Sequence, residues 1–236
     1  MCLVSYIKGA GGEVILTSNR DEAPSRSADH IKKEDRLLAQ ILFPEDTKGG
    51  SWFVVSDKGD AAIILNGAFK NHERILPYRL SRGIMLKDFF DYADFSDFLY
   101  TFDFQNVEPF TMIVYQKMQL FELRWDGGVK HLEILDTKKC HIWSSCTLYT
   151  QEIQAKREKQ FRTLLDEKAQ VDAKSMKDIH VAGQVGDSEN NFVMNREERV
   201  KTVSITQAKI KENVVSLEFE NLLLETTHLQ NMATGK

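Results

Sequence analysis

The chain has 236 residues, 42% of them hydrophobic, and this length and apolar fraction suffice for one domain with a sizeable core. The formal net charge of −4 and the scattered basic residues exclude a nucleic-acid-binding surface. No apolar run approaches the ~20 residues that cross a membrane, and the first residues lack the basic and apolar segments of a secretory signal.

The first elements of the chain are predicted to form a hairpin. Residues 3–8 have the alternation of a strand, residues 9–12 are a glycine-rich turn, and residues 13–18 form a second apolar strand. This hairpin carries the charged segment Asn19-Arg20-Asp21-Glu22 back to the start of the first strand. We therefore expect Cys2 and the charged segment to share one end of a sheet.

Cys2 carries two reactive groups if Met1 is removed, a thiol and a free α-amine. The α-amine has an unperturbed pKa of ~7.7–8.0, so it can accept the thiol proton while the sulfur attacks a carbonyl. Arg20 beside the thiol would lower the thiol pKa, and the Asp21 carboxylate would hold the amine in place. Two plainer interpretations stay open. In the first, Cys2 is a small residue at the edge of a buried strand, an interpretation that its position alone favours. In the second, the charged segment is a solvated polar turn.

The remaining elements follow in the order strands, helices, strands. Apolar residues at helical spacing predict a helix with a break around Asp94 and a later, longer helix; their ranges are 83–102 and 151–167. Strands are predicted from alternation and turn signals at 51–56, 61–65, 111–115, 120–125, 129–135, 200–205 and 214–219. We expect a mobile loop at 183–191, one domain over 1–236 and a frayed tail over 229–236.

Antiparallel hairpins with segregated helices predict the α+β class. Two sheets packed face to face with helices outside would account for the many strands. The pattern alone does not distinguish this arrangement from a single curved sheet.

Asn66 is a candidate for stabilising negative charge on a substrate oxygen. It ends the predicted strand 61–65 and precedes Gly67, where a side-chain amide can face a site and serve as an oxyanion donor. The alternative, an ordinary Asn-Gly turn, has equal weight.

The cysteines and histidines do not predict a metal site or a cofactor. The chain has three cysteines, Cys2, Cys140 and Cys146, which is an odd number without metal-ligand spacing. Residues 140–146 resemble a strand with its following turn more than a Cys/His site. No phosphate loop or dinucleotide fingerprint is present. We therefore expect no cofactor and no bound metal, and free thiols in a reducing compartment, the cytoplasm.

Three motifs in order resemble the NRDE family, the transport and Golgi organisation protein 2 family. They are Met1-Cys2, the segment Asn19-Arg20-Asp21-Glu22, and Gly49-Gly50-Ser51-Trp52, in which Ser51 replaces the threonine of the family. Ser81-Arg82-Gly83 resembles an Arg-Gly segment of the family more weakly. The resemblance extends from residue 1 to about residue 220.

That family in turn resembles the cysteine-type N-terminal nucleophile hydrolases, which include penicillin V acylase and bile salt hydrolase. This resemblance implies a four-layer αββα sandwich of two antiparallel sheets. It also implies catalytic roles for Cys2 and Asp21, and it places Asn19 and, weakly, Arg199 at the substrate. The arginine of those enzymes falls on Ser18, and Arg20 is expected on the other side of the extended segment. Ser145 stands where a second oxyanion asparagine is expected.

Two classes of function follow. The first is an amidohydrolase that cleaves a small-molecule linear amide or acyl substrate through Cys2, with Asp21 orienting the amine and Asn66, and Ser145 beside it, binding the oxyanion. The second is a binding or trafficking protein of the same fold that handles haem or lipid. The departures at Ser18 and Ser145 favour the second class, and the retained Cys2 favours the first. The sequence leaves the oligomeric state open.

Overall fold

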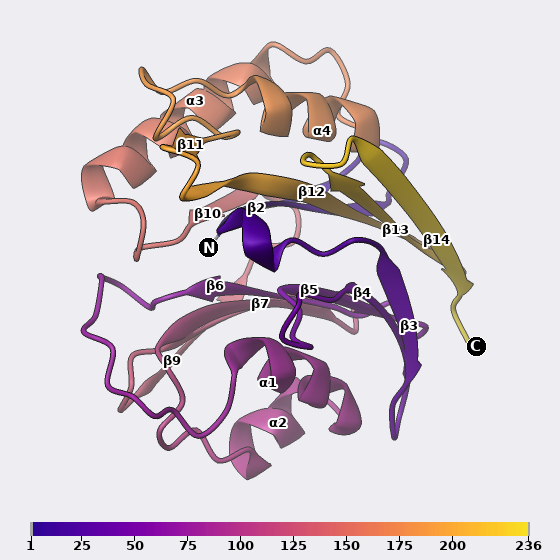
Figure 1. The fold of residues 1–236 in the computed structure, drawn as a ribbon. Coiled ribbons are helices and arrows are strands. Elements are labelled where there is room, and N and C mark those ends of the chain that lie inside the picture. Colours follow the sequence, from indigo (N-terminus) through magenta and orange to yellow (C-terminus); the bar gives the residue numbers. More distant parts are fainter. Residues whose placement is uncertain (1, 236) are drawn as a thin grey trace.

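The computed structural model describes the backbone of residues 2–235 and the side chains of residues 3–235. The predicted nucleophile, the Cys2 thiol, and the Met1 residue that precedes it therefore lie outside the described part. Two antiparallel sheets pack face to face, and helices cover both outer faces (Figure 1). The expected α+β class and the four-layer αββα sandwich are thus confirmed.

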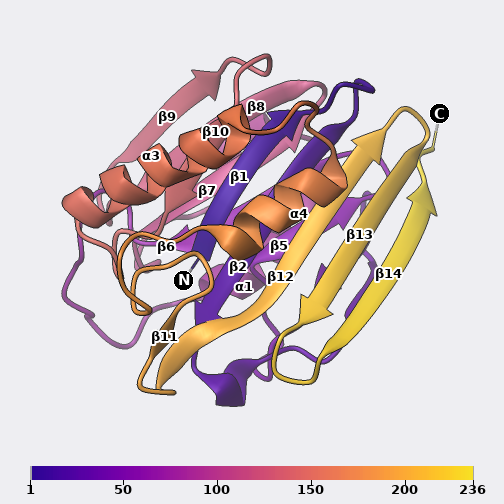
Figure 2. The same ribbon diagram turned by 90° about the horizontal axis from the view of Figure 1, so that it is seen from above.

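The first sheet, sheet A, combines strands from the beginning of the chain with strands from its end, and the two groups run side by side in Figure 2. Its order is β10-β1-β2-β12-β13-β14, with the short β11 paired to β12. The strands are β1 (Cys2–Lys8), β2 (Val14–Glu22), β10 (His141–Ser144), β11 (Asn195–Arg196), β12 (Val200–Lys211), β13 (Val214–Asn221) and β14 (Thr226–Ala233). The predicted glycine-rich turn joins β1 to β2, as expected.

The second sheet, sheet B, is a meander in which each strand pairs with the next along the chain. Short connections between consecutive strands favour this antiparallel order. The strands are β3 (Ile31–Asp35), β4 (Gln40–Pro44), β5 (Phe53–Ser56), β6 (Ala61–Asn66), β7 (Phe110–Gln116), β8 (Gln119–Trp125) and β9 (Lys130–Leu135).

Helices α1 and α2 cover sheet B, and α3 and α4 cover sheet A (Figure 1). They are α1 (Arg82–Asp88), α2 (Phe95–Thr101), α3 (Gln151–Asp166) and α4 (Ala173–Ala182), with short 3-10 turns η1 (Pro24–Arg26) and η2 (Phe89–Asp91). The predicted break at Asp94 is confirmed, because this residue caps α2 by accepting a hydrogen bond from the Asp97 N–H. Thr150 and Asp172 cap α3 and α4 in the same way.

The main core lies between the two sheets and continues under α1 and α2. It is rich in fully buried aromatic side chains such as Phe53, Phe98 and Phe110. Each such side chain contributes about 1.5–3 kcal/mol when it leaves water. A second, smaller cluster lies between sheet A and helices α3 and α4, around Phe161 and Ile179. Side chains that follow one another along β1 and β2 therefore pack alternately into the main core and into this smaller cluster.

The structure corrects the prediction for the C-terminal tail and adds elements that the sequence did not predict. The tail expected to be frayed over 229–236 is part of strand β14 as far as Ala233, and it pairs with β13 along its length. Only Met232 of β14 is buried, so the strand has almost no apolar pattern, and pairing with its neighbour defines it. The charged edge strand β3, the strand β4, the two-residue strand β11, the turn η1 and the short helix α4 were also not predicted, because local patterns of this length are weak even where the residues are apolar and buried, as in β4.

Candidate functional site

The charged segment after the first hairpin is the last part of strand β2, and its side chains alternate between the two faces of sheet A. Arg20 and Glu22 lie on the face toward sheet B, and Asn19 and Asp21 lie on the face toward the helices. Cys2 is the register partner of Arg20 on β1. The expectation that Arg20 lies on the other side from Ser18 is wrong, because side chains two residues apart in a strand share a face.

Arg20 is buried, and its guanidinium is held between sheets. It lies 3.9 Å from the ring centroid of Trp52, donates to Asp46 Oδ2 at 3.1 Å and donates to the Arg26 carbonyl at 2.8 Å. Burial alone would raise the pKa of Asp46, but the Lys48 N–H and the neighbouring guanidinium groups hold it below its usual value. The arginine is therefore fixed in one orientation, beside the register position of Cys2.

Two glycine-containing motifs meet beside Arg20. The Ser51 N–H donates to the Gly83 carbonyl at 3.2 Å. A Cβ atom on Gly83 would lie 2.8 Å from the Ser51 carbonyl oxygen, so only glycine allows the two backbones to approach this closely. The Ser51 hydroxyl donates to the Pro44 carbonyl at 2.7 Å, so it fixes the loop between β4 and β5. The weakly matching segment around Gly83 thus forms one wall of the same site as the better-matching Ser51 segment.

These walls enclose a cavity of about 450 Å³ between the sheets, which we name the inter-sheet cavity. Its volume lies in the range of small-molecule sites. Arg82 lies within it, pairs with Glu108 at 3.0 Å, and has its pKa lowered to about 10 by burial. The cavity is lined by Arg20, Glu22, Arg26, Asp46, Lys48, Gly50, Ser51, Trp52, Ile64, Asn66, Arg74, Leu76, Pro77, Tyr78, Leu80, Ser81, Arg82, Gly83 and Glu108.

Asn66 lies at the end of β6 and lines the inter-sheet cavity together with Arg20. Gly67 follows with φ +79°, a conformation that turns the chain away after the asparagine. Ser145 is buried, and its hydroxyl donates to the Asn66 carbonyl at 2.9 Å. The structure therefore brings Asn66 and Ser145 together, but the serine hydrogen bonds to the backbone of Asn66 and does not line the cavity.

Asn19 occupies the opposite face of β2, in a closed network with helix α4. Its amide nitrogen donates to the carbonyls of His180 and Phe192 at 2.9 and 2.8 Å, and its Oδ1 lies 2.7 Å from His180 Nδ1. Since Oδ1 only accepts, Nδ1 carries the imidazole proton, and Nε2 accepts from the Ser5 hydroxyl at 2.7 Å. Burial lowers the His180 pKa to about 3, so the ring is neutral.

Asp21 is completely buried on the same helix-facing side. Tyr149 donates to its Oδ2 at 2.8 Å, and Thr202 donates to its Oδ1 at 2.7 Å. Burial raises the Asp21 pKa, and the nearby Arg157 charge and these hydrogen bonds oppose the shift. The Arg157 guanidinium stacks at 4.1 Å on the Tyr149 ring and donates to the Asn190 carbonyl at 2.7 Å.

Sequence reasoning did not identify Tyr149, Arg157, His180 or Thr202 as parts of the network around the charged segment. A signal was present for two of them, since Arg157 precedes Phe161 by four residues and His180 follows Met176 by four, the spacing of a shared helix face. The loop 183–191 that we expected to be mobile is bound to this network, because Arg157 donates to the carbonyls of Asn190 and Asn191. Arg199 lies elsewhere, with its side chain 79% exposed and paired with Glu197.

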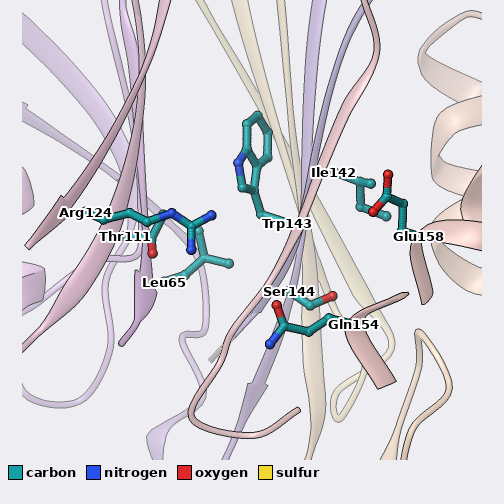
Figure 3. Close-up of a pocket in the computed structure, with 8 residues that line it drawn as sticks. All are labelled: Leu65, Thr111, Arg124, Ile142, Trp143, Ser144, Gln154 and Glu158. Carbon is teal, nitrogen blue, oxygen red and sulfur yellow. The ribbon is translucent and has the colours of Figure 1, made fainter. Parts of the chain in front are cut away.

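A smaller cavity of about 180 Å³ lies beside β10 (Figure 3). Arg124 and Thr111 of sheet B face it from one side, with Trp143 and Ser144 of β10 and Gln154 of α3 across from them. Of the predicted site residues whose side chains the structure describes, none lines it. Within residues 3–235, no three His, Cys, Asp or Glu side chains gather as a metal site, and the two described cysteines, Cys140 and Cys146, are free thiols. No helix in the described part of the chain is long and apolar enough to cross a membrane.

Comparisons with known proteins agree with the motifs and the fold. A family model described as Transport and Golgi organisation 2 matches residues 1–223. No curated protein matches the sequence. A mutant conjugated bile acid hydrolase from Clostridium perfringens is similar in structure, with a TM-score of 0.64, 9% identity, and coverage of 98% of this chain and 92% of that chain. Penicillin V acylase from Agrobacterium tumefaciens gives a TM-score of 0.61 and 8% identity, covering 98% of this chain and 86% of that chain. At these identities the likeness shows the fold.

Proposed function

Because this chain belongs to the Transport and Golgi organisation 2 family, we propose that it is a cysteine amidohydrolase that cleaves a small linear amide through Cys2 once Met1 is removed. One observation carries the proposal. The register places Cys2 directly opposite Arg20, whose side chain lines a cavity of about 450 Å³ that also contains Asn66. This arrangement supports a reaction in which a nucleophile, a fixed cation and an amide donor act together at one end of the sandwich.

The proposed reaction has two steps. In the first, the Cys2 sulfur bonds to the amide carbonyl carbon while the α-amine takes the thiol proton. The carbonyl oxygen becomes an oxyanion that accepts a hydrogen bond from the Asn66 amide, a kind of interaction that is often the largest single contribution to such catalysis. The C–N bond then breaks, and the leaving amine receives the proton from the α-ammonium group. In the second step, water attacks the thioester, releases the acid and restores the thiol.

Arg20 and Asp21 have different proposed roles because they lie on different faces of β2. Arg20 favours the thiolate through its positive charge, which its contacts with Asp46 and Trp52 hold in place. Asp21 acts as a positioning residue for the amine end of β1 from the helix-facing side. The Asn19 side chain hydrogen bonds to helix α4 and does not line the inter-sheet cavity. We therefore do not place it at the substrate. The exposed Arg199 is likewise left out, and Ser145 supports Asn66.

The lining of the inter-sheet cavity supports a substrate with an apolar acyl part and a polar or anionic end. Trp52, Ile64 and Leu80 offer apolar surface, and Arg82 with its Glu108 partner offers a fixed ion pair. The similar structures are named as a hydrolase of conjugated bile acids and an acylase of penicillin V, which supports the amide class.

The test is turnover of a panel of N-acyl amino acids and acyl thioesters by protein whose Met1 has been removed. We expect hydrolysis by the native chain and by Cys140→Ser, because Cys140 lies outside the cavity, and none by Cys2→Ser. Equal turnover by Cys2→Ser would refute the proposal. Silence across the panel, together with tight binding of haem or a lipid that Cys2→Ala leaves unchanged, would instead identify a carrier of the same fold.

A further inference from the structure

A second cavity lies at the other end of the sandwich, where the hairpin turns gather. It has a volume of about 360 Å³ and opens between the two sheets. We name it the hairpin-end cavity; it is lined by Tyr6, Lys8, Gly12, Val14, Lys58, Gly59, Tyr115, Lys117, Met118, Thr137, Ile210 and Glu212. Along strand β1, its lining residues Tyr6 and Lys8 lie roughly 14 and 20 Å from the register position of Cys2, at about 3.4 Å per residue. It is therefore distinct from the inter-sheet cavity.

The inner surface of the hairpin-end cavity is apolar and aromatic. Tyr6 comes from sheet A and Tyr115 from sheet B, with ring centroids 6.1 Å apart. Val14 and Ile210, both largely buried, extend this surface. The Tyr6 hydroxyl is already used, since it donates to the Thr137 carbonyl at 3.2 Å. The site thus offers ring faces and methyl groups to an occupant.

The lining carries three lysines and one carboxylate, Glu212. Lys117 pairs with Asp94 at 2.9 Å. Among residues 3–235, no carboxylate lies within ion-pair distance of Lys8 or Lys58. Asp60, which is influenced by the Lys58 charge, is largely buried, bonds to Gln116 at 3.0 Å and does not line the cavity. Two ammonium groups are therefore available to an anion in a protein whose net charge is −4.

The turn between β7 and β8 provides an independent indication. Lys117 and Met118 both have positive φ, at 50° and 62°. A two-residue turn of this kind favours the dipeptide Asn-Gly. A residue with a larger side chain at positive φ costs about 1–3 kcal/mol. Met118 is also 77% exposed and lines the cavity. A strained turn that exposes a flexible apolar side chain at a cavity is typical of a binding surface.

We propose that the hairpin-end cavity binds a small organic anion with an aromatic or branched apolar body, such as an aryl carboxylate. The apolar body packs on Tyr115, Val14 and Ile210, with Met118 closing over it. The carboxylate meets the ammonium groups of Lys8 and Lys58. Volume, apolar walls and a few polar groups at one side match the general features of small-molecule sites.

The experiment is titration of the full chain with 1-naphthoate, followed by amide NMR shifts. We expect saturable shifts at Tyr115, Met118 and their neighbours, and at least tenfold weaker binding of the neutral 1-naphthamide. The double variant Lys8→Ala/Lys58→Ala should weaken naphthoate binding at least tenfold. Lys33→Ala, an exposed lysine of β3 outside the cavity, serves as the matched control and should bind normally.

Met118→Gly separates binding from folding. Glycine adopts φ near 60° without strain, so this variant should melt at the native temperature or above it while binding naphthoate more weakly. The proposal is overturned if naphthoate causes no saturable shifts, if it shifts only residues of the inter-sheet cavity, or if naphthamide or the double lysine variant binds equally well. None of these results depends on turnover at Cys2.

Discussion

The two faces of β2 use adjacent residues of one charged segment for different purposes. On the face toward the helices, Asn19 and Asp21 are completely buried, and protein hydrogen bonds use both oxygens of Asp21 and the amide of Asn19. On the face toward sheet B, Arg20 and Glu22 line a cavity with room for a small molecule. Because a strand places successive side chains on opposite faces, two residues of this contiguous motif hydrogen bond within the fold and the other two line the cavity.

This division explains why so short a motif includes four polar residues. The helix-facing pair ties β2 to α4 and, through Tyr149 and Arg157, to α3 and the loop that follows α4. The cavity-facing pair belongs to an ion cluster with Arg26 and Asp46. Asp21 is proposed to position the amine as well, so we expect opposite signatures for Asn19 and for the cavity-facing side: loss of stability at Asn19 and loss of activity in the cavity.

The largest effect is expected at Asn66 on the cavity side. Removal of one oxyanion donor costs about 10²–10³-fold in kcat, so Asn66→Ala should lower kcat by that amount and change the free energy of unfolding by less than about 0.5 kcal/mol. Steady-state kinetics and urea denaturation provide the two measurements. The control is Asn71→Ala, an exposed asparagine outside the inter-sheet cavity, which should retain native kcat. An unchanged kcat in Asn66→Ala would remove Asn66 from the reaction.

The next effect is expected at Asn19 on the helix side. Asn19→Ala leaves two buried carbonyls and the His180 ring without their partner. Each unsatisfied group costs about 1–3 kcal/mol, so the free energy of unfolding should fall by about 3 kcal/mol or more. The kcat of the folded fraction should stay near its native value. A fully stable Asn19→Ala protein without activity would reverse the assignment of this face.

The smallest effect is a pH dependence due to His180. The His180 pKa is about 3 in the folded protein, below the unfolded value of 6.5. The contribution of the neutral ring to the free energy of unfolding is therefore complete above pH 6.5 and is lost as the pH falls toward 3. Between pH 7 and pH 5 the unfolded chain takes up the proton and the folded chain does not, which costs about 2 kcal/mol.

The measurement for this prediction is urea denaturation at the two pH values. His180→Gln should lose about 2 kcal/mol less than the native protein on acidification, and His30→Gln, at an exposed position, should behave as the native protein does. An identical acid dependence in all three proteins would show that His180 titrates normally and that the helix-facing network is open to water.

Sequence patterns predicted much of the fold because the strands of the inter-sheet core are strongly apolar. The hairpin of β1 and β2, the strands around residues 57–60 and the helix α3 follow from alternation, turn signals and helical spacing. Strand β14 and the edge strand β3 were missed because solvent-exposed strands lack such a pattern. Pairing with a neighbour stabilises them, and pairing partners far apart in sequence leave no local signal.

The sequence indicated individual residues of the candidate site better than it indicated their geometry. Arg20 and Asn66 were identified and do meet at one cavity. The face on which Asn19 lies, and the contact between the Ser51 and Gly83 segments, depend on register and on the approach of α1 to sheet B. The hairpin-end cavity brings together turns from four hairpins along the chain, so no single stretch of sequence indicates it.

The central claim is that the cavity-facing side of β2 serves a covalent reaction at Cys2. It is tested most directly by intact-protein and peptide mass spectrometry after a short reaction of the processed chain with a thioester or N-acyl substrate. Our account predicts one acyl adduct per chain, located on the peptide that begins with Cys2, and lost in Cys2→Ser. Burial raises the pKa of both Cys140 and Cys146, so their peptides should stay unmodified. Turnover without any adduct on Cys2, or an adduct on Cys146 alone, would contradict the account.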